Sequence, residues 1–164
     1  VAAVAEHTPA DIVVSVENTS TTLLSPALFE RYCLAHLLDY GRLVEQAGKM
    51  HELHMCGLLK ALLERIDPIP ASSIEAFTAP PLGNTRLVDG RTGCPGKSLV
   101  GGTCVNTWWR SEPEEICAYV EGELAACPDH RGIVLTTAGV APPACTLETF
   151  RAVARRLPEM VLRF

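Results

Sequence analysis

The segment Lys49–Gly57 reads Lys-Met-His-Glu-Leu-His-Met-Cys-Gly, and it predicts a strand over Met50–Met55 that breaks at a glycine. Four further apolar segments have the length of strands and also run into polar, glycine-rich or proline-rich loops. The five predicted strands are 11–16, 50–55, 73–77, 99–105 and 133–137. The first is short and rich in β-branched residues, which predicts burial on both of its faces.

Helical segments alternate with these strands. Ser25 and Pro26 are typical of a helix start, apolar residues then recur with a period near 3.6 up to Ala47, and Gly48 is typical of a helix end. Further helices are predicted over 58–66 and 147–157, with a short helix or turn within 85–96. Ser111 and Glu114 form a capping-box pattern for a helix that ends near Cys127.

Five strands alternating with helices predict an α/β fold made of parallel βαβ units. No linker or low-complexity segment divides the chain, so residues 1–164 are predicted to form a single domain. Five units do not close a barrel. The chain therefore forms either an open sheet or part of an eight-unit (β/α)8 TIM-type barrel.

Composition narrows the classes of protein. The chain has 164 residues, 48% of them hydrophobic and 20% charged, which is typical of a globular protein. A net charge of −5 argues against nucleic acid as a partner. No apolar run is long enough to span a membrane, and the first residues do not resemble a signal peptide. Seven scattered cysteines without a secretion signal favour a reduced, cytoplasmic chain.

Reactive side chains gather at the end of the second predicted strand. His54 and Cys56 are two residues apart, so their side chains point to the same side of the strand. An imidazole nitrogen and a thiolate are good Zn²⁺ ligands, and this spacing lets both reach one ion. The alternative is a buried thiol beside a hydrogen-bonded histidine, because cysteine is among the most buried residue types.

Three other side chains are candidates for the same site. Glu17 follows the first strand and could ligate metal, bind a cationic group or accept a proton; alternatively it hydrogen-bonds the amides of its own loop. Glu75 lies within a strand, where a carboxylate must be paired, so it either lines the substrate pocket or joins a core ion pair. Trp108, beside Trp109, could stack on a flat substrate ring or anchor a loop.

Several segments together resemble a known family. They are Glu17–Thr21, Leu24–Phe29, Gly48 before the strand that ends His54-Met55-Cys56-Gly57, Leu99–Gly102 followed by Glu112–Glu115, and Ile133–Pro142. In this order they resemble the uroporphyrinogen decarboxylase superfamily, which includes tetrapyrrole decarboxylases and zinc-dependent, corrinoid-linked methyltransferases. The resemblance implies a (β/α)8 barrel of which this chain supplies about five C-terminal units. It also implies that the N-terminal units, with their Arg-rich motif, are missing.

Three alternative functions follow, of which the resemblance implies the first two. The first is a methyltransferase in which zinc at His54 and Cys56 activates a thiol acceptor and a corrinoid, carried by a partner protein, donates the methyl group. The second is a metal-free decarboxylase of a tetrapyrrole substrate that uses a carboxylate such as Glu17. The third is a catalytically silent binding domain.

The zinc hypothesis needs a third ligand. In the methyltransferases this ligand is a cysteine between two glycines at the end of the last strand, where the present chain has Thr137-Ala138-Gly139. Cys104 and Cys145 are the available substitutes. The chain begins at Val1 rather than methionine, which favours a fragment or processed product, and the open strand edges of such a piece favour a homodimer.

Overall fold

The computed structural model describes all residues, Val1–Phe164, and contains one sheet of five parallel strands. The strands are β1 (Ile12–Val16), β2 (Met50–His54), β3 (Ser73–Phe77), β4 (Ser98–Gly101) and β5 (Ile133–Leu135), arranged in sequence order. In doubly wound folds the strand order reverses at a switch point. Here it never does, so the sheet has the arrangement of consecutive units of a barrel. The α/β prediction is confirmed.

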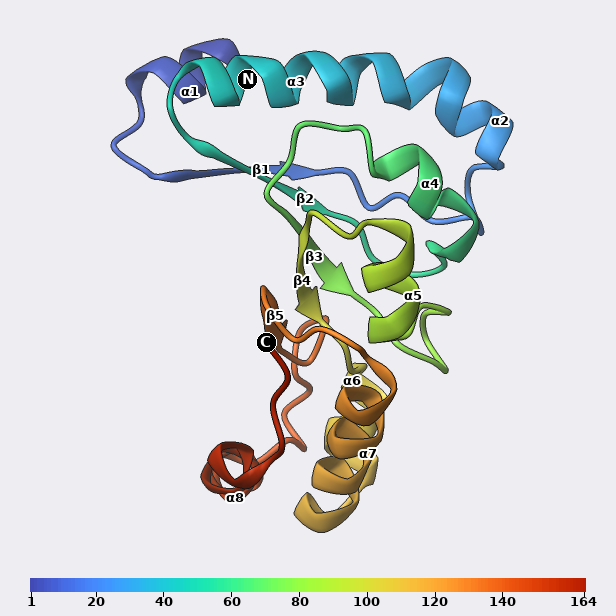
Figure 1. The fold of residues 1–164 in the computed structure, drawn as a ribbon, viewed down its shortest axis with the longest axis vertical. Coiled ribbons are helices and arrows are strands. Elements are labelled where there is room, and N and C mark those ends of the chain that lie inside the picture. Colours follow the sequence, from blue (N-terminus) through green and yellow to red (C-terminus); the bar gives the residue numbers. More distant parts are fainter.

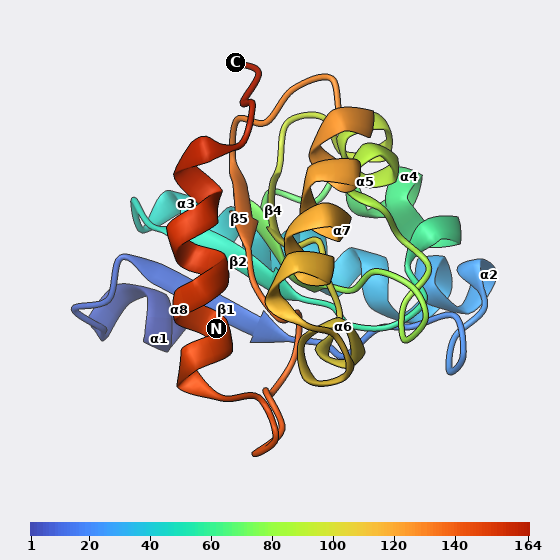
Figure 2. The same ribbon diagram turned by 90° about the horizontal axis from the view of Figure 1, so that it is seen from below.

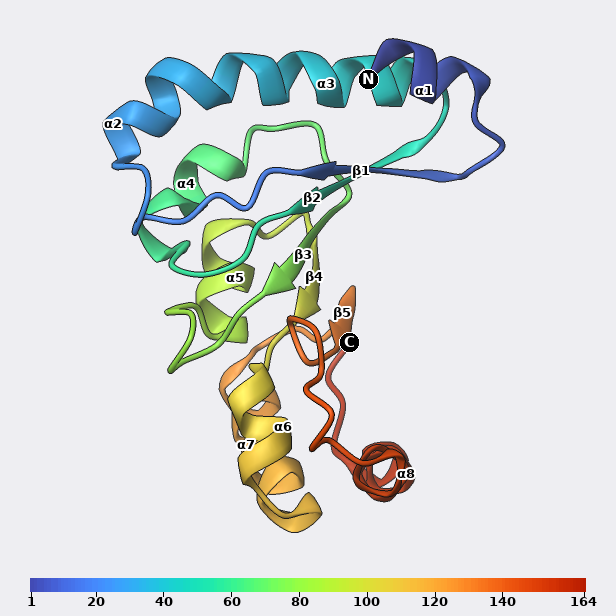
Figure 3. The same ribbon diagram turned by 180° about the vertical axis from the view of Figure 1, so that it is seen from behind.

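The helices follow the outside of the curved sheet, and its other side is open in the views of Figures 1 and 3. In chain order they are α1 (Ala2–His7), α2 (Pro26–Phe29), the π-helical η1 (Glu30–Leu34), α3 (Ala35–Gln46), the 3₁₀-helical η2 (Lys60–Leu62), α4 (Leu63–Ile66), α5 (Leu87–Gly93), α6 (Val105–Arg110), α7 (Pro113–Ala126), α8 (Leu147–Arg156) and the 3₁₀-helical η3 (Leu157–Glu159). Figure 2 shows α7 and α8 flanking the β5 end of the sheet, where the two helices pack on each other. No helix combines the length and apolar character needed to cross a lipid bilayer.

The long helical segment after β1 begins and ends as the sequence predicts. The Ser25 hydroxyl oxygen accepts a hydrogen bond from the Leu28 amide at 3.3 Å, and Pro26 occupies the first helical position. Gly48 follows the helix with φ of +70°, a left-handed conformation that glycine adopts without strain. One π-helical turn, η1, interrupts the α-helical hydrogen bonding within this segment.

Other predicted boundaries are wrong. The N-cap of α7 is Glu112, and its backbone amide donates a hydrogen bond to the Glu115 carboxylate. The predicted capping box of Ser111 and Glu114 is therefore displaced by one residue. The strand predicted over 99–105 ends at Gly101, because Gly101 and Gly102 take left-handed φ values and the chain then enters α6. Neither α6 nor α1 was predicted.

The core lies between the sheet and its helices. Side chains that point outward from the strands, such as Leu53, Ile74 and Leu99, are fully buried there in the same apolar cluster as Phe29 and Leu37 of the first long helical segment. Burial of such side chains stabilises the fold by about 1.5–3 kcal/mol each.

The opposite, inner face of the sheet is largely uncovered. Along β1, Ile12, Val14 and Val16 are 47%, 46% and 68% exposed, whereas the intervening Val13 and Ser15 are buried. The prediction that this strand is buried on both faces is therefore wrong. Five strands curve without closing, so no opposite strands pack against the inner face.

Candidate active site at the end of strands β2 and β3

His54 and Glu75 meet on the inner face of the sheet. They are register partners on β2 and β3, and His54 Nδ1 lies in close hydrogen-bond contact with Glu75 Oε2. Their side chains are 27% and 30% exposed, so the pair is accessible from the open side. Both residues stand near the carboxyl ends of their strands, the edge at which barrel enzymes carry their reacting groups.

Strand alternation puts His54 on this face. In β2 the side chains of His51 and Leu53 point into the buried layer, and those of Glu52 and His54 point to the inner face. Glu75 has the corresponding position on β3. The Met55 amide donates to the Glu75 carbonyl at 3.1 Å, so the two backbones stay paired just beyond the histidine.

Cys56 lies two residues after His54, beyond the buried Met55. Its thiol is half-buried and lies 3.6 Å from the side-chain oxygen of Asn18. Sequence reasoning did not identify Asn18 as a site residue. Its backbone has φ of +47°, a left-handed conformation that asparagine tolerates better than most residues. An asparagine in a polar turn directly after a strand is the signal that could have identified it.

The loops after β1 and β2 are hydrogen-bonded to each other, which fixes the surroundings of the candidate site. The His54 carbonyl accepts hydrogen bonds from the Glu17 and Asn18 amides at 3.2 and 3.1 Å. The Ser20 hydroxyl oxygen accepts one from the Leu58 amide at 3.0 Å. A Cβ atom at Gly57 would lie 2.8 Å from this hydroxyl oxygen, so glycine permits the close approach of the two loops.

Glu17 is not brought together with His54 and Glu75 by any hydrogen bond or ion pair. Burial raises the pKa of the Glu17 carboxyl, and the charge of His36 on α3 partly opposes this shift. The Glu17 charge, in turn, helps burial raise the pKa of the Cys33 thiol on η1. The charged and titratable groups that interact with Glu17 in this way belong to the first long helical segment.

A second carboxylate lies one layer deeper on the inner face. Glu52 is the register partner of Ser73, whose hydroxyl donates to Glu52 Oε2 at 2.7 Å. β2 and β3 are thus joined by two successive polar pairs, Glu52–Ser73 and His54–Glu75. Barrel interiors are usually filled by branched apolar side chains, so these two pairs distinguish this part of the sheet.

Trp108 occupies a different environment from these residues. Its ring is 8% exposed, stacks on Phe150 of α8 with 4.7 Å between ring centroids, and donates through Nε1 to Thr103 Oγ1 at 2.8 Å. The structure thus places Trp108 in the core between α6 and α8. The neighbouring Trp109 is 42% exposed and lies under the Arg110 guanidinium.

His54 and Cys56 are the types of residue that bind zinc, but a catalytic zinc site needs a third protein ligand. His54 and Cys56 supply the nitrogen and sulfur donors that zinc prefers, and catalytic zinc normally takes three protein ligands. Cys104 is fully buried and its thiol lies 3.5 Å from the Pro80 carbonyl oxygen, while Cys145 packs against the core beside α8. No three His, Cys, Asp or Glu side chains converge on one point. The residues described here do not complete a three-ligand zinc site.

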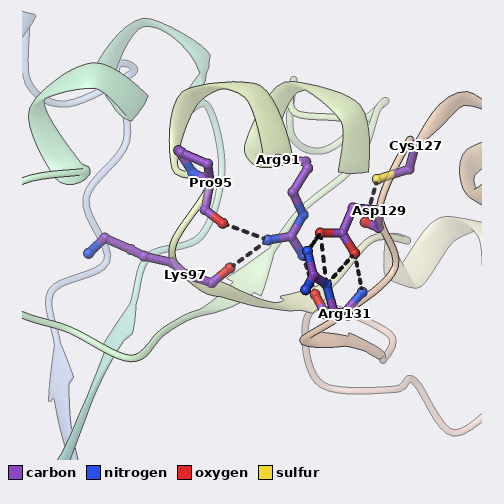
Figure 4. Close-up of polar contacts among 6 residues, drawn as sticks. All are labelled: Arg91, Pro95, Lys97, Cys127, Asp129 and Arg131. Atoms are coloured by element: carbon purple, nitrogen blue, oxygen red, sulfur yellow. Dashed lines mark hydrogen bonds and ion pairs between the residues drawn. The ribbon is translucent and has the colours of Figure 1, made fainter. Parts of the chain in front are cut away.

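The opposite end of the sheet has a structural network rather than a candidate site. Figure 4 shows Arg91 of α5 reaching the carbonyl oxygens of Pro95 and Lys97, at 3.1 and 3.2 Å, and that of Arg131. Arg131 is itself paired with Asp129 at 2.8 Å. These contacts tie together the segments that lead into β4 and β5. A cavity of about 390 Å³ lies elsewhere, between α7 and the residues after α8.

Comparison with known proteins identifies a similar fold. No protein-family model and no curated protein matches the sequence. Among solved structures, a methyltransferase from Methanosarcina mazei is similar, with a TM-score of 0.75 and 19% sequence identity. The similarity covers 92% of this chain and 42% of that methyltransferase. The chain therefore has the fold of somewhat less than half of that enzyme.

Proposed function

We propose that this chain is part of a methyltransferase of the uroporphyrinogen decarboxylase superfamily type, with its reacting centre at His54, Cys56 and Glu75. The observation that carries the proposal is the position of these side chains. His54 and Glu75 lie at the carboxyl edge of the inner face, and Cys56 follows His54 by two residues, in a sheet whose fold is similar to part of a methyltransferase. In barrel enzymes this edge carries the catalytic groups.

The metal part of the proposal assigns His54 and Cys56 as two zinc ligands. At least one further ligand is required from outside the groups that converge here. Bound zinc would lower the pKa of a thiol acceptor, so that a thiolate is present at neutral pH. The methyl donor in this proposal is a corrinoid carried by a partner protein.

The residues around the pair suit a small apolar group. Val16, Val100 and Val134 lie in the same register layer of the inner face as His54 and Glu75. These valines offer apolar contacts on either side of the polar pair, which would favour a methyl group over water. The Cys56 thiol donates to the side-chain oxygen of Asn18, and it would lose this proton on binding zinc as a thiolate.

A metal-free decarboxylase is the second candidate. It is favoured because no three His, Cys, Asp or Glu side chains converge on one point. Glu52 and Glu75 place carboxylates on the inner face, where they could stabilise a protonated pyrrole of a tetrapyrrole substrate. Glu17, the carboxylate that the sequence suggests for this role, has its pKa raised by burial, and the charge of His36 on α3 partly opposes this shift.

Zinc content distinguishes the two candidates. The chain is purified without chelators and with its thiols reduced, and zinc is measured by elemental analysis in the wild type, Cys56→Ser and Cys33→Ser. Cys33 is a half-buried thiol on η1, outside the site, and serves as the matched control. We expect near-stoichiometric zinc in the wild type and Cys33→Ser and its loss in Cys56→Ser. A wild type without zinc contradicts the metal part, and decarboxylation of a tetrapyrrole is then the assay to run.

A further inference from the structure

The contact between His54 and Glu75 determines which nitrogen of the imidazole is free. Glu75 Oε2 approaches Nδ1, and a carboxylate oxygen only accepts hydrogen bonds. The proton of a neutral His54 ring is therefore held on Nδ1, which donates to Glu75. The lone pair of Nε2 is then free to bind another group. The His54 and Glu75 side chains make no hydrogen bond other than the one that joins them.

The backbone departs from regular strand geometry directly after Glu75. Ala76 has φ of +56° and is 1% exposed, and the register of β3 with β4 shifts between Glu75 and Phe77. A left-handed alanine costs about 1–2 kcal/mol. Such strain persists only where the surroundings impose it, and it is common at functional sites. The bulge ends regular pairing directly after Glu75.

Two close contacts with β4 accommodate this bulge. Gly101 comes so near that a Cβ atom there would lie 2.3 Å from the Phe77 carbonyl oxygen. The Gly102 amide donates to that same oxygen at 2.9 Å. Regular pairing of Glu75 with Val100 on one side and with His54 on the other is therefore kept, although the strand changes register one residue later.

We propose that Glu75 is a positioning residue, which fixes His54 as the Nδ1–H tautomer so that Nε2 faces the reacting group. The step that Nε2 performs, binding a metal or accepting a proton, rests on the proposed function. The tautomer itself does not. Carboxylates that hold metal-bound histidines in this manner affect metal affinity by about 10- to 100-fold.

Glu52 provides a matched control on the same face. It lies on β2 two residues before His54, is half-buried as Glu75 is, and bonds to Ser73 rather than to a histidine. Glu52→Gln removes the same charge one layer away from His54. Glu75→Gln replaces the carboxylate by an amide, whose oxygen accepts and whose nitrogen donates, so the amide accepts either ring tautomer.

The test reads the ring nitrogens of His54 directly. The ¹⁵N shifts of the histidine rings are recorded by NMR on the full chain at alkaline pH, where the rings are neutral, and His54→Gln identifies the signals among the five histidines. We expect the Nδ1–H tautomer in the wild type and Glu52→Gln, and a mixture of both tautomers in Glu75→Gln. Glu75→Asp, which keeps the carboxylate on a shorter side chain, should recover part of the wild-type ratio.

The outcomes separate this inference from the proposed function. A wild-type His54 in the Nε2–H form, or in an equal mixture, overturns the positioning role, and this result needs only the wild type if Glu75→Gln does not fold. Zinc titration is the second measurement, with a loss of about 10- to 100-fold in affinity expected for Glu75→Gln and no change for Glu52→Gln. If the wild type binds no zinc, the metal part of the proposed function fails while the tautomer result stands.

Discussion

His51 and His54 lie three residues apart on β2 and have opposite environments. His51 is 2% exposed in the layer under the helices, where its ring bonds to Ser15 Oγ at 2.8 Å and to the Pro70 carbonyl at 3.1 Å. His54 lies on the open inner face beside Glu75. Because successive strand residues face opposite sides, an odd spacing places one histidine in the core and the other in the candidate site.

The buried histidine makes stability depend on pH. Burial, with a contribution from the Lys97 charge, lowers the pKa of His51 below 6.5, and the Pro70 carbonyl opposes this shift. The unfolded ring therefore takes up a proton at a higher pH than the folded ring. The free energy of unfolding should fall as the pH drops from 6.5 through the lower folded pKa.

Urea unfolding at pH about 7.5 and about 5.5 measures this effect. In His51→Gln the free energy of unfolding should fall less between these two pH values than it does in the wild type. His7→Gln changes an exposed ring and should keep the dependence. If the free energy of unfolding changes equally with pH in the wild type and in His51→Gln, His51 does not cause the pH dependence.

Trp108 gives a second residue-scale prediction, because its ring is packed against Phe150 and bonded to Thr103. Trp108→Ala should lower the free energy of unfolding by about 3–5 kcal/mol. Trp109→Ala removes an exposed ring and its contact with Arg110, so it should lose about 1 kcal/mol or less. Urea unfolding of both variants compares them. A Trp108→Ala protein of wild-type stability would contradict the core position and restore the stacking role.

The candidate site could be predicted where strand alternation alone determines the direction of a side chain. Alternation predicts His54 and Cys56, whereas Glu75 is predicted because a carboxylate within a strand must be paired, and His54 and Glu75 are in contact. Asn18 was missed because its position depends on a left-handed turn that folds the loop over β2. Glu17 lies an even number of residues from the buried Val13 and Ser15, and the sequence alone did not show which face of β1 the helices cover.

At the level of elements, strand starts were predicted well and strand ends less well. β3 matches its predicted range, and β2 begins where expected. β4 ends early at the two glycines, and β5 ends at Leu135, the residue that pairs with Gly101, the last residue of β4. α1 has no side-chain cap to mark its start, and α6 begins after the two glycines that were read as part of a strand.

Two glycines in these elements should respond oppositely to alanine. Gly101 has φ of +151° and a Cβ there would lie 2.3 Å from a backbone oxygen, so Gly101→Ala should lose about 2 kcal/mol or more. Gly122 lies in α7, where a Cβ would meet nothing within 4 Å, so Gly122→Ala should gain about 1 kcal/mol. Thermal unfolding of both variants checks the signs. A neutral Gly101→Ala would mean that β3 and β4 do not approach this closely.

For the whole molecule, the uncovered inner face predicts association. Ile12, Val14, Val16, Met50 and Val134 are each nearly half or more exposed on this face. Soluble monomers rarely expose contiguous apolar surface of this kind. At micromolar concentrations the chain should therefore sediment as dimers or larger species.

Substitution on the inner face tests this expectation by analytical ultracentrifugation. Ile12→Lys, far from His54, should shift the distribution toward the monomer. Val140→Lys changes a 93% exposed loop residue and should leave the distribution unchanged. A wild type that stays monomeric at every concentration would contradict the role given to this face.

The consecutive strand order also bears on how the chain is made. Each strand pairs with the one before it in the sequence, and none waits for a strand that comes much later. As a chain leaves the ribosome from its N-terminus, every new strand meets an edge that already exists. Folding can then advance one unit at a time, because each new strand pairs with an edge that the preceding unit provides.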